Sequence, residues 1–404
     1  MLRSIIIALL LFGGLYLPTS SNGNLSSSTL MLNSFICFLI LGMLFLQNRK
    51  INKTVFFIVL GGNIVLWIAT LITPFPDLKY GSYVSYLLFF LLCCLNLKDI
   101  EIPKSINSFF LVANIINIVM GLAIIFQVEA VHSFIKQNYG AFYDDLVPNM
   151  LFKFKPVISF ASHSLAGFFL YIFFYLNLQT YKVKNKHIYL LISFIYIYLL
   201  FCLKSNAGFM FMLIAVAQLM VYYFLNKRIV AYSIVLIGFM CCWIYSEQVD
   251  AFLNMIELTM DQTFSSHSNG VLGRYSDNGN LAGNLDYINE HPFRPIGFGY
   301  SPEIFYGDSG IVEYLTRGSV LLVLSMYGAL FLFLKNNLYS KKIAYSLFIL
   351  IVLFEIGFTV LTYGRMLYLL PFVVLYLNSL EQEKEAVSNI SKPKKKKIKI
   401  RWSA

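Results

Sequence analysis

The stretch INEHPFRPIGFGYSPEIFYGDSGIVEYLTRG, residues 288–318, is a polar interruption in a chain that is otherwise almost continuous hydrocarbon. It closes a longer polar segment, residues 247–318, which holds ten of the twenty acidic residues and no lysine. In a membrane protein, ionisable groups gathered in one place are candidates for function. We therefore predict that the chemistry of this chain lies in this segment.

The composition on either side predicts an all-α polytopic membrane protein. Hydrophobic residues make up 58% of the chain and charged residues 13%, whereas roughly a quarter of positions are charged in ordinary soluble domains. Apolar runs long enough to cross a bilayer as helices recur throughout, at roughly 20 residues each. The formal net charge of +11 does not indicate nucleic acid as a partner, because the basic residues lie between apolar runs and in a terminal tail.

About twelve transmembrane helices are expected. We place them at residues 3–18, 30–47, 54–72, 80–97, 108–128, 159–180, 188–204, 207–225, 229–245, 311–334, 342–362 and 365–380. The chain then divides into N-terminal spans (1–128), an external loop (129–158), central spans (159–245), a large external loop (246–310), C-terminal spans (311–380) and a basic tail (381–404).

The lysines and arginines predict the orientation. Of the 31 basic residues, 22 fall on the side that holds both termini and 9 on the other. By the positive-inside rule the first side is cytoplasmic, so the large loop faces outward. External arginines are over-represented relative to external lysines, which suggests that the lysines set topology and the arginines carry chemistry.

The run HPFRPIGFG contains Arg294 between two prolines and two glycines, which predicts a defined, non-helical backbone. A guanidinium binds phosphate oxygens in a bidentate way, so Arg274, Arg294 and Arg317 are candidate diphosphate ligands. The alternative for Arg294 is an ion pair with Glu290.

The run GDSGIVEYLTRG predicts a helix start with Asp308 or Ser309 as the N-cap. Asp308 and His291 are the candidate catalytic bases. The alternative for Asp308, and the more frequent role of an aspartate at such a position, is the helix cap. Glu313 and Arg317 are four residues apart, so they are either an ion pair or part of the site.

Four further ionisable residues lie inside or next to predicted spans and could line the same cavity: His163, Lys204, Glu355 and Arg365. The alternative for Glu355 and Arg365 is that they pair with each other. Asp144 and Asp145 form a solvated turn more readily than a cation site. No acidic metal cage and no nucleotide-binding motif is evident, so we expect metal-independent chemistry without a cofactor.

These residues resemble a known family. FASHSLAG (160–167) opening a central span, LKSNAGFMFML (203–213), and HPFRPIGFG followed by GDSG are similar to the O-antigen polymerase and ligase family. The resemblance covers roughly residues 155–370. Ligases of that family usually carry a histidine and an asparagine before the last helix, where this chain has Asp308 and Ser309, which favours the polymerase branch.

The resemblance implies a glycosyltransferase of the bacterial cytoplasmic membrane. Its substrate would be an oligosaccharide linked to polyprenyl diphosphate, transferred to the non-reducing end of a lipid-linked repeat unit of an O-antigen or capsule. Membrane lipids and a chain-length regulator are the implied partners. The alternatives are a ligase that transfers glycan to a lipid A core, a flippase or transporter, and a binding or scaffold protein.

Overall fold

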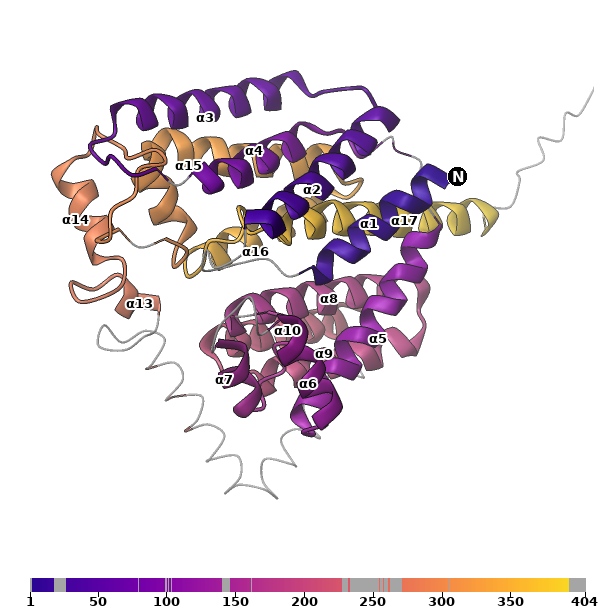
Figure 1. The fold of residues 1–404 in the computed structure, drawn as a ribbon. Coiled ribbons are helices and arrows are strands. Elements are labelled where there is room, and N and C mark those ends of the chain that lie inside the picture. Colours follow the sequence, from indigo (N-terminus) through magenta and orange to yellow (C-terminus); the bar gives the residue numbers. More distant parts are fainter. Residues whose placement is uncertain are drawn as a thin grey trace, which may run out of the picture.

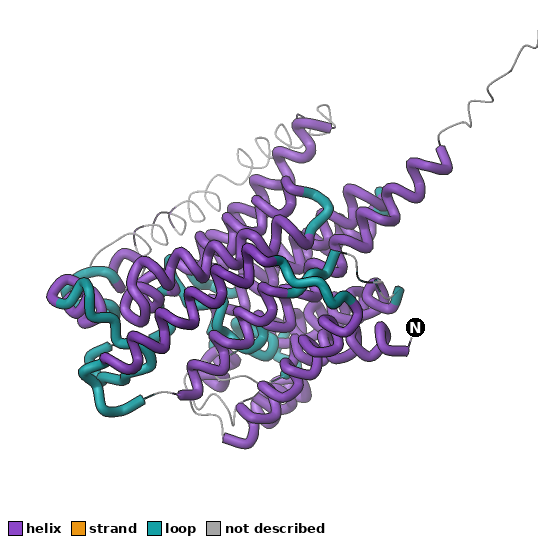
Figure 2. Tube along the Cα trace, turned by 90° about the horizontal axis from the view of Figure 1, so that it is seen from above, coloured by secondary structure: helices purple, strands orange, loops and turns teal. Residues whose placement is uncertain are grey.

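The computed structural model describes residues 2–17, 27–139, 146–226 and 271–391, except positions 79, 99, 101, 103, 161 and 305, together with residues 232, 254, 257 and 261. Within these ranges the chain is helical and forms no β-strand, as the composition predicts (Figure 1). Seen after a 90° turn, the helices lie side by side as one bundle (Figure 2).

The helices are α1 (Leu2–Tyr16), α2 (Ser27–Gln47), α3 (Lys53–Ile72), α4 (Tyr80–Cys94), α5 (Ser105–Ile125), α6 (Glu129–Tyr139), α7 (Leu146–Phe152), α8 (His163–Lys184), α9 (His187–Cys202), α10 (Asn206–Asn226), α13 (Val271–Arg274), α14 (Ala282–Glu290), α15 (Gly310–Asn337), α16 (Lys341–Glu355) and α17 (Met366–Ser391).

Eleven of the twelve predicted spans coincide with one of these helices, and the ninth, residues 229–245, lies outside the described residues except at position 232. By length and composition α3, α5, α10 and α15 are able to cross a membrane. These four helices are consistent with a membrane protein, and the count of twelve spans stays a prediction.

Helix α8 is buried along most of its length. Its sequence is apolar on every face over Leu165–Phe174, and each of these residues is buried. A helix that is hydrophobic all round must be surrounded on all sides, and α8 accordingly packs against α9, α10 and α17. Gly167 of α8 faces Gly208 of α10, where an added Cβ on Gly167 would lie 3.5 Å from the Gly208 Cα. The FASHSLAG and LKSNAG runs therefore meet.

Buried amides join the helices around α8. Asn177 of α8 donates to Asn114 Oδ1 of α5 at 2.7 Å, and the Tyr196 hydroxyl of α9 donates to the same oxygen at 2.9 Å. Tyr16 of α1 donates to Asn117 Oδ1 at 3.0 Å. Polar side chains of this kind contribute to helix association inside a membrane.

Several helix ends differ from the ends of the predicted spans, as three examples show. Helix α8 begins at His163 rather than 159, because Ser162 accepts the backbone N–H of Ser164 and caps the helix. Helix α16 ends at Glu355 rather than 362. Helix α17 runs past 380 into the predicted tail, where Lys184 forms an ion pair with Glu383 at 2.9 Å. The first part of the polar segment, residues 247–268, lies outside the described residues except at positions 254, 257 and 261.

The Pro/Gly-rich loop enters a break in α15. Gly318 and Ser319 have non-helical backbone angles, and the carbonyls of Thr316 and Arg317 instead accept the N–H groups of Ile296 and Gly297 at 3.0 and 2.9 Å. Gly297 has φ +55°, and a Cβ there would lie 2.3 Å from the Thr70 nitrogen of α3. The loop is therefore fixed between α3 and α15, as its prolines and glycines predict.

Candidate functional site

Arg274 and Asp308 form an ion pair at the surface of the polar segment. Arg274 Nη1 lies 3.2 Å from Asp308 Oδ1, and the two side chains are 23% and 15% exposed. Asn280 donates to the other carboxylate oxygen, Oδ2, at 2.8 Å. The structure thus brings together a predicted diphosphate ligand and a predicted base, within reach of solvent.

Ser309, and not Asp308, caps α15. Ser309 Oγ accepts the N–H of Val312 at 3.4 Å, so the Asp308 carboxylate is not occupied by capping the helix. The Tyr275 hydroxyl lies 2.7 Å from Ser309 Oγ and 2.6 Å from the Ile356 carbonyl oxygen, and burial raises the pKa of Tyr275. We refer to Arg274, Tyr275, Asn280, Asp308 and Ser309 as the Arg274 site.

Arg317 lies in the protein interior. It is 1% exposed, its Nε lies 3.0 Å from Glu313 Oε1, and its Nη1 donates to the Gly297 carbonyl at 2.9 Å. Its guanidinium stacks 4.4 Å from the Tyr306 ring centroid. The expected Glu313–Arg317 ion pair is present, and the guanidinium holds the HPFRPIGFG loop rather than an open phosphate site.

Glu313 accepts two further hydrogen bonds from buried side chains. Tyr86 of α4 donates to Glu313 Oε1 at 3.2 Å, and Thr359 donates to Oε2 at 3.0 Å. A buried charge pair is stable only when the remaining lone pairs are satisfied in this way. The contacts therefore assign Glu313 to the support of the loop.

Arg294 and His291 are exposed at the end of α14. The His291 ring stacks on Tyr287 at 4.9 Å between centroids, and the Arg294 carbonyl accepts from the Tyr287 hydroxyl at 2.8 Å. The alternative pairing of Arg294 with Glu290 is not found, because Arg294 forms no ion pair with a described residue. Neither side chain contacts the Arg274 site.

Three lysines form a basic group beside α8, which we call the lysine group: Lys153, Lys155 and Lys204. Lys155 Nζ donates to the Lys204 carbonyl at 3.1 Å. Burial, together with the charges of Lys153 and Lys204, lowers the pKa of Lys155. No described acidic side chain forms an ion pair with any of these lysines, so their charges favour an anion.

His163 is the first residue of α8. The positive charges of Lys155, Arg274 and Lys153 all act on its ring. Its buried Nδ1 atom has no hydrogen-bond partner among the described residues. Because Arg274 and Lys155 both lie near this one ring, the two basic sets belong to the same region of the molecule.

Glu355 is fully buried at the end of α16. It accepts the backbone N–H groups of Val360 and Leu361 at 2.7 and 2.8 Å, and the hydroxyls of Tyr314 and Tyr327 at 3.2 and 3.0 Å. The expected alternative, an ion pair with Arg365, is wrong, since each side chain has other partners.

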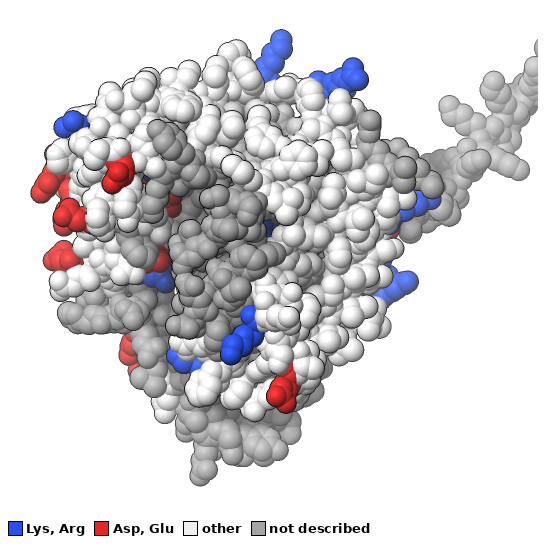
Figure 3. Space-filling view, viewed as in Figure 1, with Lys and Arg blue, Asp and Glu red and all other residues white. Residues whose placement is uncertain are grey.

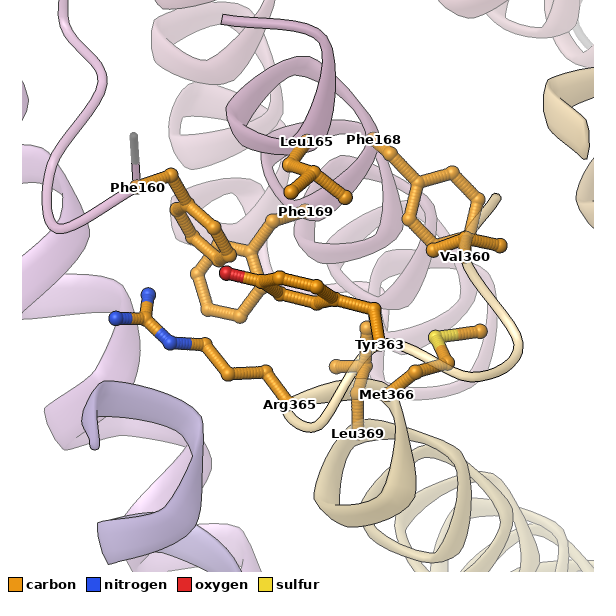
Figure 4. Close-up of a pocket in the computed structure, with 9 residues that line it drawn as sticks. All are labelled: Phe160, Leu165, Phe168, Phe169, Val360, Tyr363, Arg365, Met366 and Leu369. Carbon is orange, nitrogen blue, oxygen red and sulfur yellow. The ribbon is translucent and has the colours of Figure 1, made fainter. Parts of the chain in front are cut away.

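Arg365 lines a small apolar cleft between the start of α8 and the start of α17 (Figure 4). Its guanidinium donates to the Leu17 carbonyl at 2.7 Å and to Ser159 Oγ and carbonyl at 2.8 Å each, and it stacks 4.3 Å from the Phe160 ring. These bonds occupy all three guanidinium nitrogens. Arg365 lines this cleft, while His163, Lys204, Glu313 and Glu355 do not, so a cavity that these five residues share stays a prediction.

On the face seen in Figure 3, most acidic side chains gather over the α14 end. Basic side chains reach the surface lower on this face, with acidic ones beside them, and also at its upper and right edges. Asp277, Asp286, Glu290 and Glu303 are among the exposed acidic residues near α14. Their charges disfavour an anionic ligand at α14 itself.

Sequence reasoning missed part of the site. Of the lysine group, the sequence singles out Lys204 as a residue that could line the cavity, while Lys153, Lys155, Tyr275 and Asn280 carry no signal of their own. Lys155 and Lys204 lie 49 residues apart, so no local spacing could have joined them. Among the described residues no three His, Cys, Asp or Glu side chains are placed to hold a metal ion, and the Asp144–Asp145 pair lies outside the described residues.

Comparisons of the chain with protein families, with curated proteins and with solved structures found no match.

Proposed function

We propose that this chain is a polysaccharide polymerase of the bacterial cytoplasmic membrane. It transfers a glycan from polyprenyl diphosphate to the non-reducing end of a lipid-linked repeat unit at the outer face. The single observation that carries the proposal is the Arg274–Asp308 pair, at 3.2 Å and partly open to solvent, beside a lysine group without described acidic partners. The resemblance of the FASHSLAG and HPFRPIGFG runs supplies the reaction class.

The diphosphate of the donor binds between Arg274 and Lys155. A guanidinium offers two parallel donors to phosphate oxygens, and an ammonium adds a point charge. Both groups stabilise the negative charge that develops on the diphosphate as it leaves the sugar. Arg294, exposed at the rim of the loop, meets the incoming glycan and does not hold the diphosphate.

Asp308 accepts the proton of the attacking hydroxyl. In the unliganded chain its carboxylate is held by Arg274 and Asn280. When the diphosphate takes over the guanidinium, Asp308 loses one of its two partners, and its Oδ1 atom is free to accept a proton. The bond between the anomeric carbon and the diphosphate oxygen breaks, the acceptor oxygen forms the new glycosidic bond, and its proton passes to Asp308.

The test is a gel of surface glycans from cells that carry Arg274→Ala or Asp308→Ala. Loss of long chains with a single repeat unit retained supports the polymerase. Loss of all attached glycan indicates a ligase instead. Unchanged chain length, with both variants expressed at the wild-type level, contradicts the site assignment.

A further inference from the structure

Residues 356–361, the first part of the connection between α16 and α17, contact the Arg274 site although none of them is charged. The Gly357 carbonyl accepts from Arg274 Nη1, and the Ile356 carbonyl oxygen lies 2.6 Å from the Tyr275 hydroxyl. The Thr359 N–H donates to the carbonyl of Gly307, directly before Asp308, at 2.9 Å. The position of Arg274 relative to Asp308 therefore depends on where this connection lies.

Glu355 fixes the connection at its far end. Its Oε1 accepts the N–H groups of Val360 and Leu361 at 2.7 and 2.8 Å. The chain thus leaves α16 at Glu355 and is bound back to the same side chain five residues later. Two short charge-assisted hydrogen bonds of this kind define the shape of a loop.

The same carboxylate also bonds to α15. Tyr314 and Tyr327, both on α15, donate to its Oε1 and Oε2 at 3.2 and 3.0 Å. A Cβ added to Gly310, the first residue of α15, would lie 2.1 Å from Glu355 Oε2. One side chain therefore sets the distance between the connection and the start of α15, where Asp308 lies.

No described lysine, arginine or histidine forms an ion pair with Glu355. Burying a carboxylate without a cation is costly, and the four donors offset that cost. An apolar residue would fill the same space without the cost of burying a charge, but it would leave two backbone N–H groups unsatisfied. The carboxylate is thus suited to hold a loop shape.

We propose that Glu355 is a positioning residue that holds Arg274 against Asp308 by fixing the Ile356 and Gly357 carbonyls. The inference rests on the proposed function only in the reaction it assigns to Arg274. The positional claim stands on the geometry alone and has its own measurement.

Hydrogen exchange of the full chain in micelles tests the positional claim. In Glu355→Ala, amide exchange rises at least about tenfold both in 356–361 and in 271–281, because the two segments are held together. Glu355→Gln keeps an oxygen acceptor for Val360 and Leu361 and stays within about threefold of wild type. Ser193→Ala, which removes a buried hydroxyl from α9, is the control and leaves both segments protected.

If Glu355→Ala does not fold, Glu355→Asp replaces it in this experiment. Aspartate keeps the carboxylate, but its side chain is one methylene shorter and does not reach the same hydrogen-bond donors. It is expected to open both segments. Faster exchange in 356–361 alone, in either variant, overturns the inference. Glutamine behaving like alanine also overturns it.

Surface glycan length provides the second measurement. Glu355→Ala and Arg274→Ala each shorten the chains, and the double variant is no worse than Arg274→Ala, whereas a residue that only stabilises the fold would add its effect. Additive effects overturn the positioning role. If Arg274→Ala alone has no effect, the proposed function fails, and hydrogen exchange still decides the positional claim.

Discussion

Arginine at position 317 and arginine at position 274 have opposite surroundings. Arg317 is buried, paired with Glu313 and bonded to the loop carbonyl of Gly297. Arg274 is partly exposed and paired with Asp308. The same residue type in the same polar segment therefore supports the fold in one place and is partly open to solvent in the other.

Arg317→Ala is expected to lower the stability of the chain by about 3–5 kcal/mol, because it leaves the Glu313 carboxylate buried without its cation. The measurement is the apparent melting temperature in detergent. Arg294→Ala is the matched control, because this exposed side chain is expected to change stability by less than about 0.5 kcal/mol. An unchanged melting temperature for Arg317→Ala would show that the ion pair does not support the loop.

The lowered pKa of Lys155 predicts that the stability of the chain depends on pH. Because its pKa is lowered in the folded chain, the unfolded chain keeps that proton to higher pH. Stability contributed at this position therefore rises as pH increases from the lowered folded pKa toward 10.5. We expect the stability of wild type to rise relative to that of Lys155→Met over this pH range. The measurement is the melting temperature of both proteins at a series of pH values. A difference that shrinks as pH rises contradicts the lowered pKa.

At the scale of elements, α15 is the helix that organises the site. Its first residues follow Asp308, its first turns carry Glu313 and Arg317, and its break at Gly318 and Ser319 receives the HPFRPIGFG loop. Ser319 has φ +62° and ψ −169°, a region that is almost restricted to glycine. The break therefore stores strain, which the loop hydrogen bonds offset.

Ser319→Gly is expected to raise stability by about 1 kcal/mol, since glycine adopts these backbone angles without strain. Gly297→Ala is expected to lower stability, because its Cβ would meet the Thr70 nitrogen at 2.3 Å. Both are measured by melting, with the wild type as reference. A fall in stability for Ser319→Gly would mean that the break is not strained.

The sequence predicted the elements better than their ends. Apolar runs of about twenty residues located eleven helices, because burial in lipid or protein demands them. The end of α16 was missed by seven residues, since IGFTVL reads as a continuation of the apolar run. What ends the helix there includes bonds to Glu355 and Gly307, which sequence periodicity does not contain.

The candidate site was predicted only in part for the same reason. Arg274 and Asp308 were each chosen by residue type and by their place in the polar segment. Their pairing across 34 residues, and the approach of Lys155 and His163 from the central helices, come from tertiary packing. No spacing in the sequence carries that information.

At the scale of the whole molecule, the predicted orientation places the α13–α14 end outside the cytoplasm. Phe293 at this end is 94% exposed, so Phe293→Cys is expected to react with a membrane-impermeant maleimide added to spheroplasts. Wild type gives the background to be subtracted, because Cys37, Cys93 and Cys94 are buried while Cys202 is partly exposed. Labelling of Phe293→Cys only after the membrane is permeabilised reverses the orientation.

The most direct test of the central claim is polymerisation by the purified protein in lipid vesicles. The substrate is a repeat unit linked to polyprenyl diphosphate, and the readout is glycan length with time. Wild type is expected to lengthen the chains in the presence of a chelator. Asp308→Asn, with a wild-type melting temperature, is expected to be at least about 100-fold slower, while Arg294→Ala stays closer to wild type. Wild-type rates for Asp308→Asn would contradict the account.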